Sequence, residues 1–152
     1  MQPFDLELTA MHHHLKLRKA ERGTEVWCPV RRRWVVFEPE EMVRQLLIQR
    51  LVATEGYPLS RLSVERGLQV NSLQRRFDLL VYDPAVQPFL LVECKAPSVP
   101  IAGEGLRQLS NYNHAVRAPY LLITNGIDSF CFEMHYRKGK AEPLPHLPPY
   151  PA

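Results

Sequence analysis

The clearest pattern in the chain is a pair of apolar runs separated by turn-forming residues. The first run is Leu79–Tyr82 and the second is Phe89–Val92, and both are rich in branched and aromatic side chains. Between them stand Asp83-Pro84 and Gln87-Pro88, dipeptides typical of turns. The pattern predicts a β-hairpin with a moderately long loop at the centre of a sheet.

Apolar residues that recur every three or four positions predict two helices. The first begins at Glu38-Pro39, where proline suits the first helical position, and continues to about Glu55 before Gly56. The second spans about Glu104 to Val116. The predicted inner faces consist of Val43, Leu46, Leu47 and Leu51 in the first helix and Leu106, Leu109, Asn113 and Val116 in the second.

Shorter apolar runs predict the remaining strands, at Leu15–Arg18, Val26–Cys28, Trp34–Phe37, Leu62–Val70, Pro119–Thr124 and Phe130–Tyr136. Gly67 suggests a bulge or bend in the fourth of these, and Asn125-Gly126 favours a hairpin between the last two.

The predicted fold class is α/β (α+β in some schemes), a central mixed sheet with a helix on each face and an N-terminal β-hairpin extension. We expect one domain over residues 1–152. Residues 1–11 show no clear period and are open to fraying, and the proline-rich residues 143–152 form an extended tail that either packs on the body or stays loose.

Composition narrows the class of protein without identifying it. The 152 residues are 45% hydrophobic, which is enough for one core, and the net charge of +3 permits nucleic-acid binding without requiring it. The sequence has no apolar run of 18 residues and no signal peptide, so we expect a soluble cytoplasmic protein with no membrane partner. The three cysteines lie in or beside apolar stretches and are expected to be buried free thiols.

Charged residues gather at the ends of the two central strands. Because side chains alternate along a strand, Glu93 and Lys95 share one face about 7 Å apart, whereas Cys94 points the other way. Asp78, near the start of the neighbouring strand, is the expected third member. A buried charge needs a partner, so the acid of Asp78 is expected to face a cation.

The first helix offers a further acid. At 100° per residue Glu40 falls within the apolar stripe and Glu41 nearly opposite, although the sequence does not settle which of the two faces inward. A carboxylate in that stripe needs a partner, for which a metal ion is one candidate. The alternative is an ordinary acid that stabilises the helix dipole.

Basic residues provide candidate contacts to DNA phosphates at Arg31, Arg32, Arg33, Arg75 and Arg76. For the first three, a solvated hairpin tip is an equally good interpretation. The run His12–His14 lacks a partner at a structural metal spacing and is interpreted as a polar entry into the first strand.

Five segments, taken in order, resemble the PD-(D/E)XK nuclease superfamily and, more closely, the N-terminal nuclease domain of the endonuclease subunit of type I restriction enzymes, in a stand-alone form. The resemblance covers roughly Val35 to Tyr136, with Phe77 standing where the superfamily name places proline. The segments are Pro39–Gln45, Phe77-Asp78, Val92–Pro97, Gln108–Tyr112 and Thr124–Gly126.

The resemblance implies a metal-dependent DNA endonuclease. Asp78 and Glu93 would hold Mg²⁺, for which Mn²⁺ substitutes, together with the backbone carbonyl of Cys94 and the Glu40 carboxylate. Lys95 would orient the attacking water and stabilise negative charge. Gln108 and Tyr112, four residues apart on the second helix, would face the same site, although an ordinary amphipathic helix edge also explains them.

Other functions stay open from the sequence. A non-catalytic nucleic-acid- or partner-binding module that keeps the fold is the main alternative, and a pure oligomerisation unit explains the charged residues poorly. The sequence carries no Gly-x4-Gly-Lys-Ser/Thr motif, so ATP-driven translocation would need a motor partner. DNA is the expected partner, and a homo-oligomer or a complex with motor or specificity proteins is compatible with the sequence.

Overall fold

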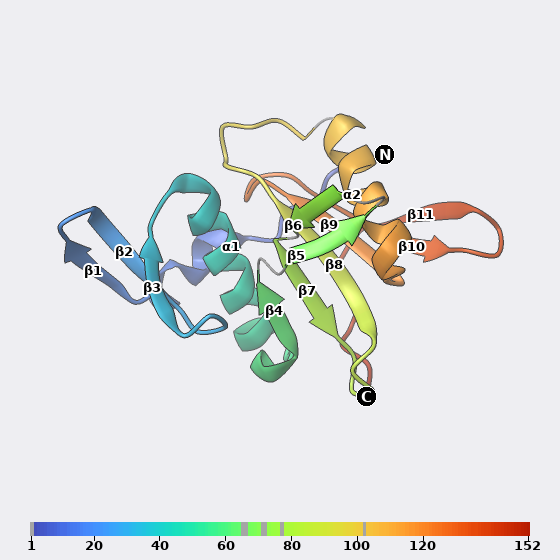
Figure 1. Cartoon of the computed structure of the whole chain (residues 1–152). Helices are drawn as coiled ribbons and strands as arrows, with labels where there is room; N and C mark the ends of the chain where they lie inside the picture. The colour runs from blue at the N-terminus through green and yellow to red at the C-terminus, as the bar shows by residue number, and fades with distance from the viewer. Residues whose placement is uncertain (1, 65–66, 71–72, 77, 102) are drawn as a thin grey trace.

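The computed structural model describes residues 2–64, 67–70, 73–76, 78–101 and 103–152, and for residues 67–70, 73–76, 104, 108, 111 and 112 it describes the backbone alone. The main element is a six-stranded mixed sheet with strand order β11-β10-β9-β8-β7-β4 (Figure 1). Strands β8 and β9 run parallel, whereas the other neighbouring pairs are antiparallel. The strands are β4 (Leu62–Val64), β7 (Leu79–Tyr82), β8 (Pro88–Cys94), β9 (Tyr120–Thr124), β10 (Ser129–His135) and β11 (Lys140–Leu144).

The predicted central hairpin is β7–β8. Its register pairs Leu79 with Val92 and Val81 with Leu90, so the two apolar runs lie side by side. The loop is ordered by Asp83, whose Oδ1 accepts N–H groups from Ala85 and Gln87 at 2.9 Å. The turn residues recognised in the sequence therefore act as expected, because a short acid can bond its own following backbone.

A helix covers each face of the sheet, as predicted. Helix α1 (Pro39–Gln49) continues as a π-helical turn, η2 (Arg50–Thr54), and its Val43 and Leu47 share a core with Val92 of β8. Helix α2 (Gly103–Val116) connects β8 to the parallel strand β9, and its Leu109 packs with Leu91 and Ile123 on the opposite face. The fold class is therefore α+β, with the two faces of β8 buried under different helices.

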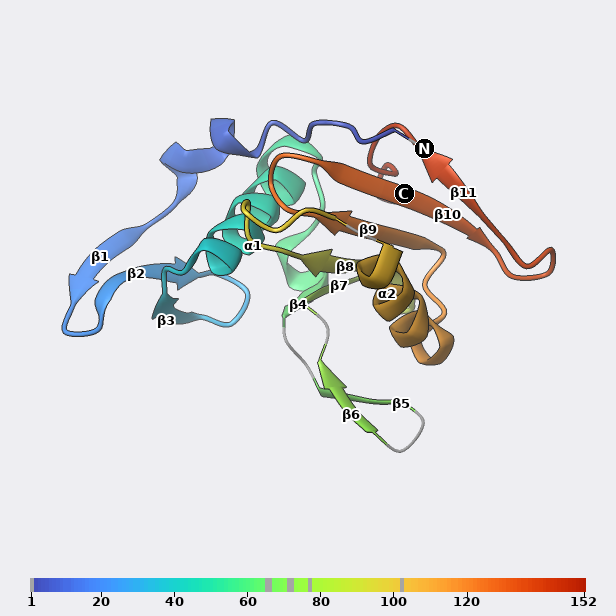
Figure 2. The same cartoon turned by 90° about the horizontal axis from the view of Figure 1, so that it is seen from above.

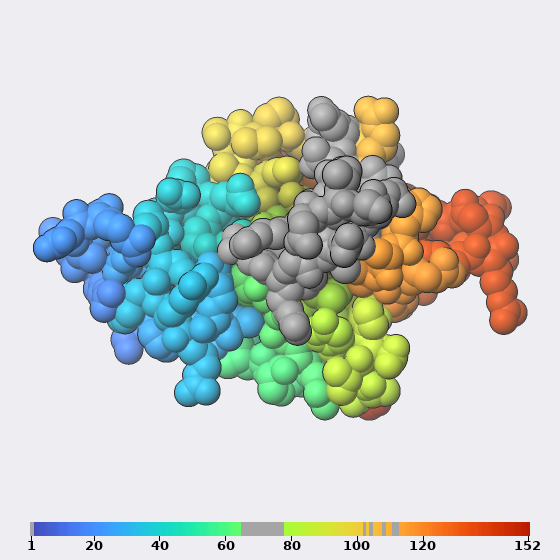
Figure 3. Space-filling model, in the orientation of Figure 1, coloured from blue at the N-terminus to red at the C-terminus, as the bar shows by residue number. Residues whose placement is uncertain are grey.

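The N-terminal extension is a three-stranded antiparallel sheet of β1 (Leu17–Ala20), β2 (Gly23–Cys28) and β3 (Arg33–Val36). It projects at one end of the molecule, and the tip of the β10–β11 hairpin projects at the other (Figure 3). The three cysteines are free and buried, as expected. Among the described residues, no helix is long and apolar enough to cross a bilayer.

The predicted single strand Leu62–Val70 is wrong. Strand β4 ends at Val64, and the chain then forms a separate two-stranded ladder of β5 (Gly67–Val70) and β6 (Leu73–Arg76). This ladder projects from the main sheet (Figure 2). Gly67 was expected to bend a continuous strand, but β5 pairs with β6 rather than with β7, because pairing depends on register and not on local apolar content.

Both ends of the chain are packed on the body. The sequence leaves residues 1–11 open to fraying; of the described part, Phe4 bridges Ser129, Leu6 and Leu8 are buried, and a 3₁₀ helix, η1 (Leu8–His14), follows (Figure 2). The histidines 12–14 are exposed in η1 ahead of β1.

At the C-terminal end, Pro143 lies in the edge strand β11, a position where its missing N–H is tolerated. Beyond it, Leu147 is buried, and the Tyr57 hydroxyl donates to the Pro148 carbonyl at 2.5 Å. A second hydroxyl, that of Tyr150, donates to the Tyr82 carbonyl at 2.9 Å. Of the two alternatives for the tail, packing on the body is confirmed.

Candidate active site

The structure brings Asp78, Glu93 and Lys95 together at one end of the central hairpin. The pairing of Leu79 with Val92 places Asp78 opposite Glu93, and the side chains of the two acids interact. Lys95 Nζ lies 3.2 Å from Glu93 Oε1. Strand alternation thus predicted the shared face correctly, and the antiparallel register supplied the third group.

Asp78 already has a cationic partner within the protein. Its buried Oδ1 accepts from Arg44 Nη2 at 2.7 Å, and its Oδ2 accepts from the backbone N–H of Cys94 at 2.7 Å. Burial by itself would lower the pKa of Arg44, but the neighbouring Glu41 and Asp78 outweigh it and raise the pKa, so the guanidinium stays charged. The expectation of a cation facing Asp78 is met by an arginine.

The assignment of Glu40 to the inner stripe of α1 is wrong. The Glu40 side chain is 51% exposed, and its Oε1 lies 3.6 Å from Arg44 Nη2 at the rim of the cluster. Glu41 is the buried acid: it accepts two bonds from Arg31 Nη2 at 2.8 Å, one from Arg44 at 2.5 Å and one from Gln45 at 2.9 Å. The buried face of α1 includes Arg44 and Gln45 as well as the apolar residues. A stripe drawn through the apolar residues alone was therefore centred on the wrong side, and it included Glu40 in place of Glu41.

The missed residue with the largest role is Arg44. It lies three residues before Leu47 and seven before Leu51, so it shares their face of the helix. A cation at a core position of an amphipathic helix calls for buried acids, and this pattern was visible in the sequence. The residue joins α1 to the start of β7 through Asp78, and it also pairs with Glu41 on its own helix.

The electrostatics of Glu93 reflect crowding of acids. Its side chain is 13% exposed, and burial, followed by the nearby Asp78, raises its pKa to about 7 in spite of Lys95. For Lys95, partial burial lowers the pKa, but the acids Glu93, Asp78 and Glu40 outweigh burial and raise it. The site therefore holds a charged ammonium beside Glu93, whose ionisation is opposed by burial and by Asp78, and a further cation would relieve that conflict.

The thiol of Cys94 is buried in the core shared with α1, and burial, followed by the nearby Asp78, raises its pKa well above the ordinary value. The backbone carbonyl of Cys94 as a metal ligand stays a prediction, and so does the metal itself.

The remaining predicted residues divide into three groups. Gln108 and Tyr112 lie on α2, and Arg75 and Arg76 on β6, but the side chains of all four are outside the described part of the structure. Arg31 forms an ion pair with Glu41, and only 12% of its side chain is exposed. It is therefore neither part of a solvated hairpin tip nor placed to contact a phosphate. Arg32 and Arg33 are exposed at the turn into β3 and stay candidates for DNA contacts.

Comparisons with known proteins agree with the fold. A solved fragment described as an HsdR subunit of a type I restriction enzyme from Vibrio vulnificus YJ016 superposes with a TM-score of 0.52 at 20% sequence identity, over 72% of this chain. The alignment spans 23% of the solved chain, and the likeness concerns the fold. A search of curated proteins found no match. A family model described as the type I restriction enzyme R protein N terminus matches residues 39–148, most of the chain, which therefore belongs to this family.

Proposed function

We propose that this chain is a metal-dependent endonuclease that hydrolyses phosphodiester bonds in DNA. The observation that carries the proposal is the convergence of Asp78 and Glu93 beside Lys95, with crowding that raises the pKa of Glu93 to about 7. Membership of the R protein N-terminal family supports the same activity. An acid with a raised pKa next to a second acid and an ammonium group is typical of catalytic sites.

The donor set fits a hard divalent cation. Asp78 and Glu93 would hold Mg²⁺ or Mn²⁺, with the Cys94 carbonyl and the exposed Glu40 carboxylate as further oxygen ligands. Asp78 accepts from Arg44 at Oδ1 and from the Cys94 N–H at Oδ2, and each carboxylate oxygen has more than one lone pair, so both can also face a cation. When bound, such an ion supplies Lewis-acid stabilisation of the phosphoryl oxygens and a more acidic water.

The protein's own groups have distinct roles in this proposal. Lys95, held by Glu93, places a positive charge where the phosphate becomes more negative and orients the attacking water. Arg44 and the Cys94 N–H fix both oxygens of Asp78, so Arg44 acts as a positioning residue. Gln108 and Tyr112 are proposed to support Lys95 or a phosphate from α2.

The test is a cleavage assay on linear, circular and single-stranded DNA with a panel of divalent metals. Asp78→Asn is expected to abolish metal-dependent cleavage, with Asp83→Asn, a half-buried acid in the β7–β8 loop, as the charge-matched control. Because Arg44 loses an anionic partner, Asp78→Asn is also expected to lower the stability of the fold by about 1–3 kcal/mol. Equal cleavage by Asp78→Asn and Asp83→Asn, both confirmed folded, would contradict the proposal.

One observation favours a second candidate, a non-catalytic DNA- or partner-binding module. The Arg44–Asp78 pair balances the Asp78 charge without any metal. In that case the wild-type chain would bind DNA and cut none of the substrates with any metal in the panel. For either candidate we propose DNA as a partner and, since the family is named for one part of a larger enzyme, motor or specificity proteins or a second copy of the chain as others.

A further inference from the structure

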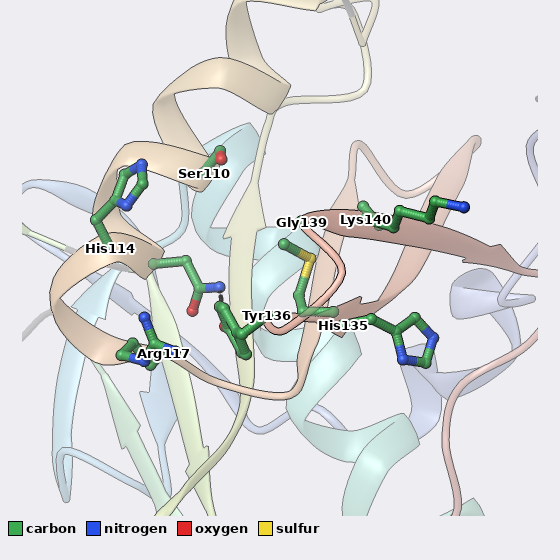
Figure 4. Close-up of a pocket in the computed structure, with 10 residues that line it drawn as sticks. Ser110, His114, Arg117, His135, Tyr136, Gly139 and Lys140 are labelled. Carbon is green, nitrogen blue, oxygen red and sulfur yellow. Dashed lines mark hydrogen bonds between the residues drawn. The ribbon is translucent and has the colours of Figure 1, made fainter.

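A polar hollow lies at the far end of α2 from Glu93 and Lys95. This α2–hairpin pocket, with a volume of about 420 Å³, is formed between the last turns of α2 and the β10–β11 hairpin (Figure 4). Its basic lining residues are His114, Arg117, His135 and Lys140, and none of the described residues lining it is acidic. A hollow lined by basic residues from both α2 and the hairpin suits an anionic ligand.

Arg117 has an unusual backbone for its residue type. It follows α2 with φ of 54°, and its N–H donates to the Asn113 carbonyl at 2.7 Å, which is the left-handed helix ending that glycine ordinarily provides. An L-residue with a side chain is disfavoured there. A basic side chain at this position, where glycine would be easier, calls for a role beyond ending the helix.

The Arg117 guanidinium is held in place by Tyr136. Its carbon lies 4.3 Å from the centre of the Tyr136 ring, and the Tyr136 hydroxyl donates to the Ala118 carbonyl at 2.5 Å and accepts from Asn113. Stacking occupies the face of the guanidinium and leaves its N–H edge available, which is the arrangement that binds phosphate well.

The opposite wall continues the positive charge. Lys140 is exposed and lies opposite His135 in the β10–β11 register, and the hairpin tip between them carries the exposed Arg137 and Lys138. Glu133 and Glu142 lie near His135, at 3.6 and 3.1 Å from its Nε2, and neither lines the pocket.

We propose that the α2–hairpin pocket binds the phosphodiester backbone of DNA, as a second contact distinct from the cluster at Asp78 and Glu93. Gly105, in the first turn of α2, packs against Ile123, which is the β9 partner of Glu93, whereas Arg117 follows the last turn. The 14 residues of α2 span about 20 Å, the length of about six base pairs. DNA engaged at the acidic cluster therefore reaches the pocket along α2, and this inference rests on the proposed function.

The test measures affinity of the full chain for a labelled DNA duplex by fluorescence anisotropy, without divalent metal, across a range of salt concentrations. The variants are Arg117→Gly and Lys140→Ala, with Lys19→Ala on the β1–β2 sheet as the control for loss of one exposed charge. Each phosphate contact contributes a slope of about −0.9 in log affinity against log salt, which makes the affinity at 0.1 M salt about eightfold higher than at about 1 M salt. We expect each pocket variant to lose about that much, and Lys19→Ala to lose little.

Arg117→Gly separates binding from folding, because glycine suits the φ of 54° and should leave the melting temperature unchanged or raised. Inorganic phosphate and a mononucleotide serve as competitors. Salt slopes and affinities of both pocket variants equal to those of Lys19→Ala would overturn the proposal. The proposal would also be overturned if the variants no longer bound inorganic phosphate but kept the wild-type affinity for the duplex.

The outcome is distinguishable from failure of the nuclease proposal. A wild-type chain that binds DNA through Arg117 and Lys140 but cuts none keeps this inference and removes the endonuclease. Suppose instead that cleavage depends on Asp78, but that Arg117→Gly and Lys140→Ala bind DNA as tightly as the control variant. That result would keep the endonuclease proposal and remove this inference.

Discussion

Replacing Glu93 with glutamine is expected to stabilise the metal-free protein at neutral and alkaline pH. Glu93 is buried beside Asp78, and these two causes raise its pKa from 4.5 to about 7. Glutamine keeps the size of the side chain and removes the charge. The same substitution should abolish stabilisation by Mg²⁺, since it removes a proposed ligand.

The magnitude and the pH window follow from proton linkage. An acid with a raised pKa in the folded state holds its proton more tightly when folded, so folding loses stability as the pH rises from 4.5 to about 7. Below 4.5 the acid is protonated in both states and contributes nothing, and above 7 the cost reaches its ceiling of about 3 kcal/mol. Lys95 loses its partner in the variant, which leaves an expected net gain of about 1–3 kcal/mol at pH 8.

Urea unfolding followed by circular dichroism between pH 4.5 and 8, in a chelator, measures the effect. For a chain of this size the expected gain corresponds to a rise in melting temperature of roughly 3–10 °C at pH 8. Glu21→Gln, an exposed acid at the β1–β2 turn, is the control for the loss of one charge. Equal stability of Glu93→Gln and wild type at pH 8, or an equal gain at pH 4.5 and pH 8, would refute the reasoning.

Two further predictions concern the site and the tail. Lys95→Ala leaves both carboxylates in place, so Mg²⁺ affinity by calorimetry should stay the same or rise, while single-turnover cleavage should fall about 100- to 1,000-fold. A loss of metal affinity as large as that of Glu93→Gln would contradict the separate roles. Tyr57→Phe leaves the Pro148 carbonyl without its donor, so it should lower the free energy of unfolding by about 1 kcal/mol and speed proteolysis after Leu144. Unchanged stability and proteolysis would show that the tail does not depend on this bond.

The family could be recognised from short motifs, because each motif consists of residues that are close together in the sequence. The shared face of Glu93 and Lys95 follows from strand alternation, and the β7–β8 hairpin follows from two apolar runs around a turn. The packing of a helix on each face follows from helical periodicity in α1 and α2. These features required no knowledge of distant contacts.

The sequence by itself thus determined the fold class, the positions of most elements and the acid–base character of the strand ends. Only the tertiary structure decided that Glu41 faces inward and that Arg44 holds Asp78, because both depend on charges brought from β2–β3 and β7 to α1. It also decided that Phe4 joins Ser129 and that β5 pairs with β6. The partner of a buried charge and the partner of a short strand are set by groups distant in sequence, and local periodicity carries no information about them.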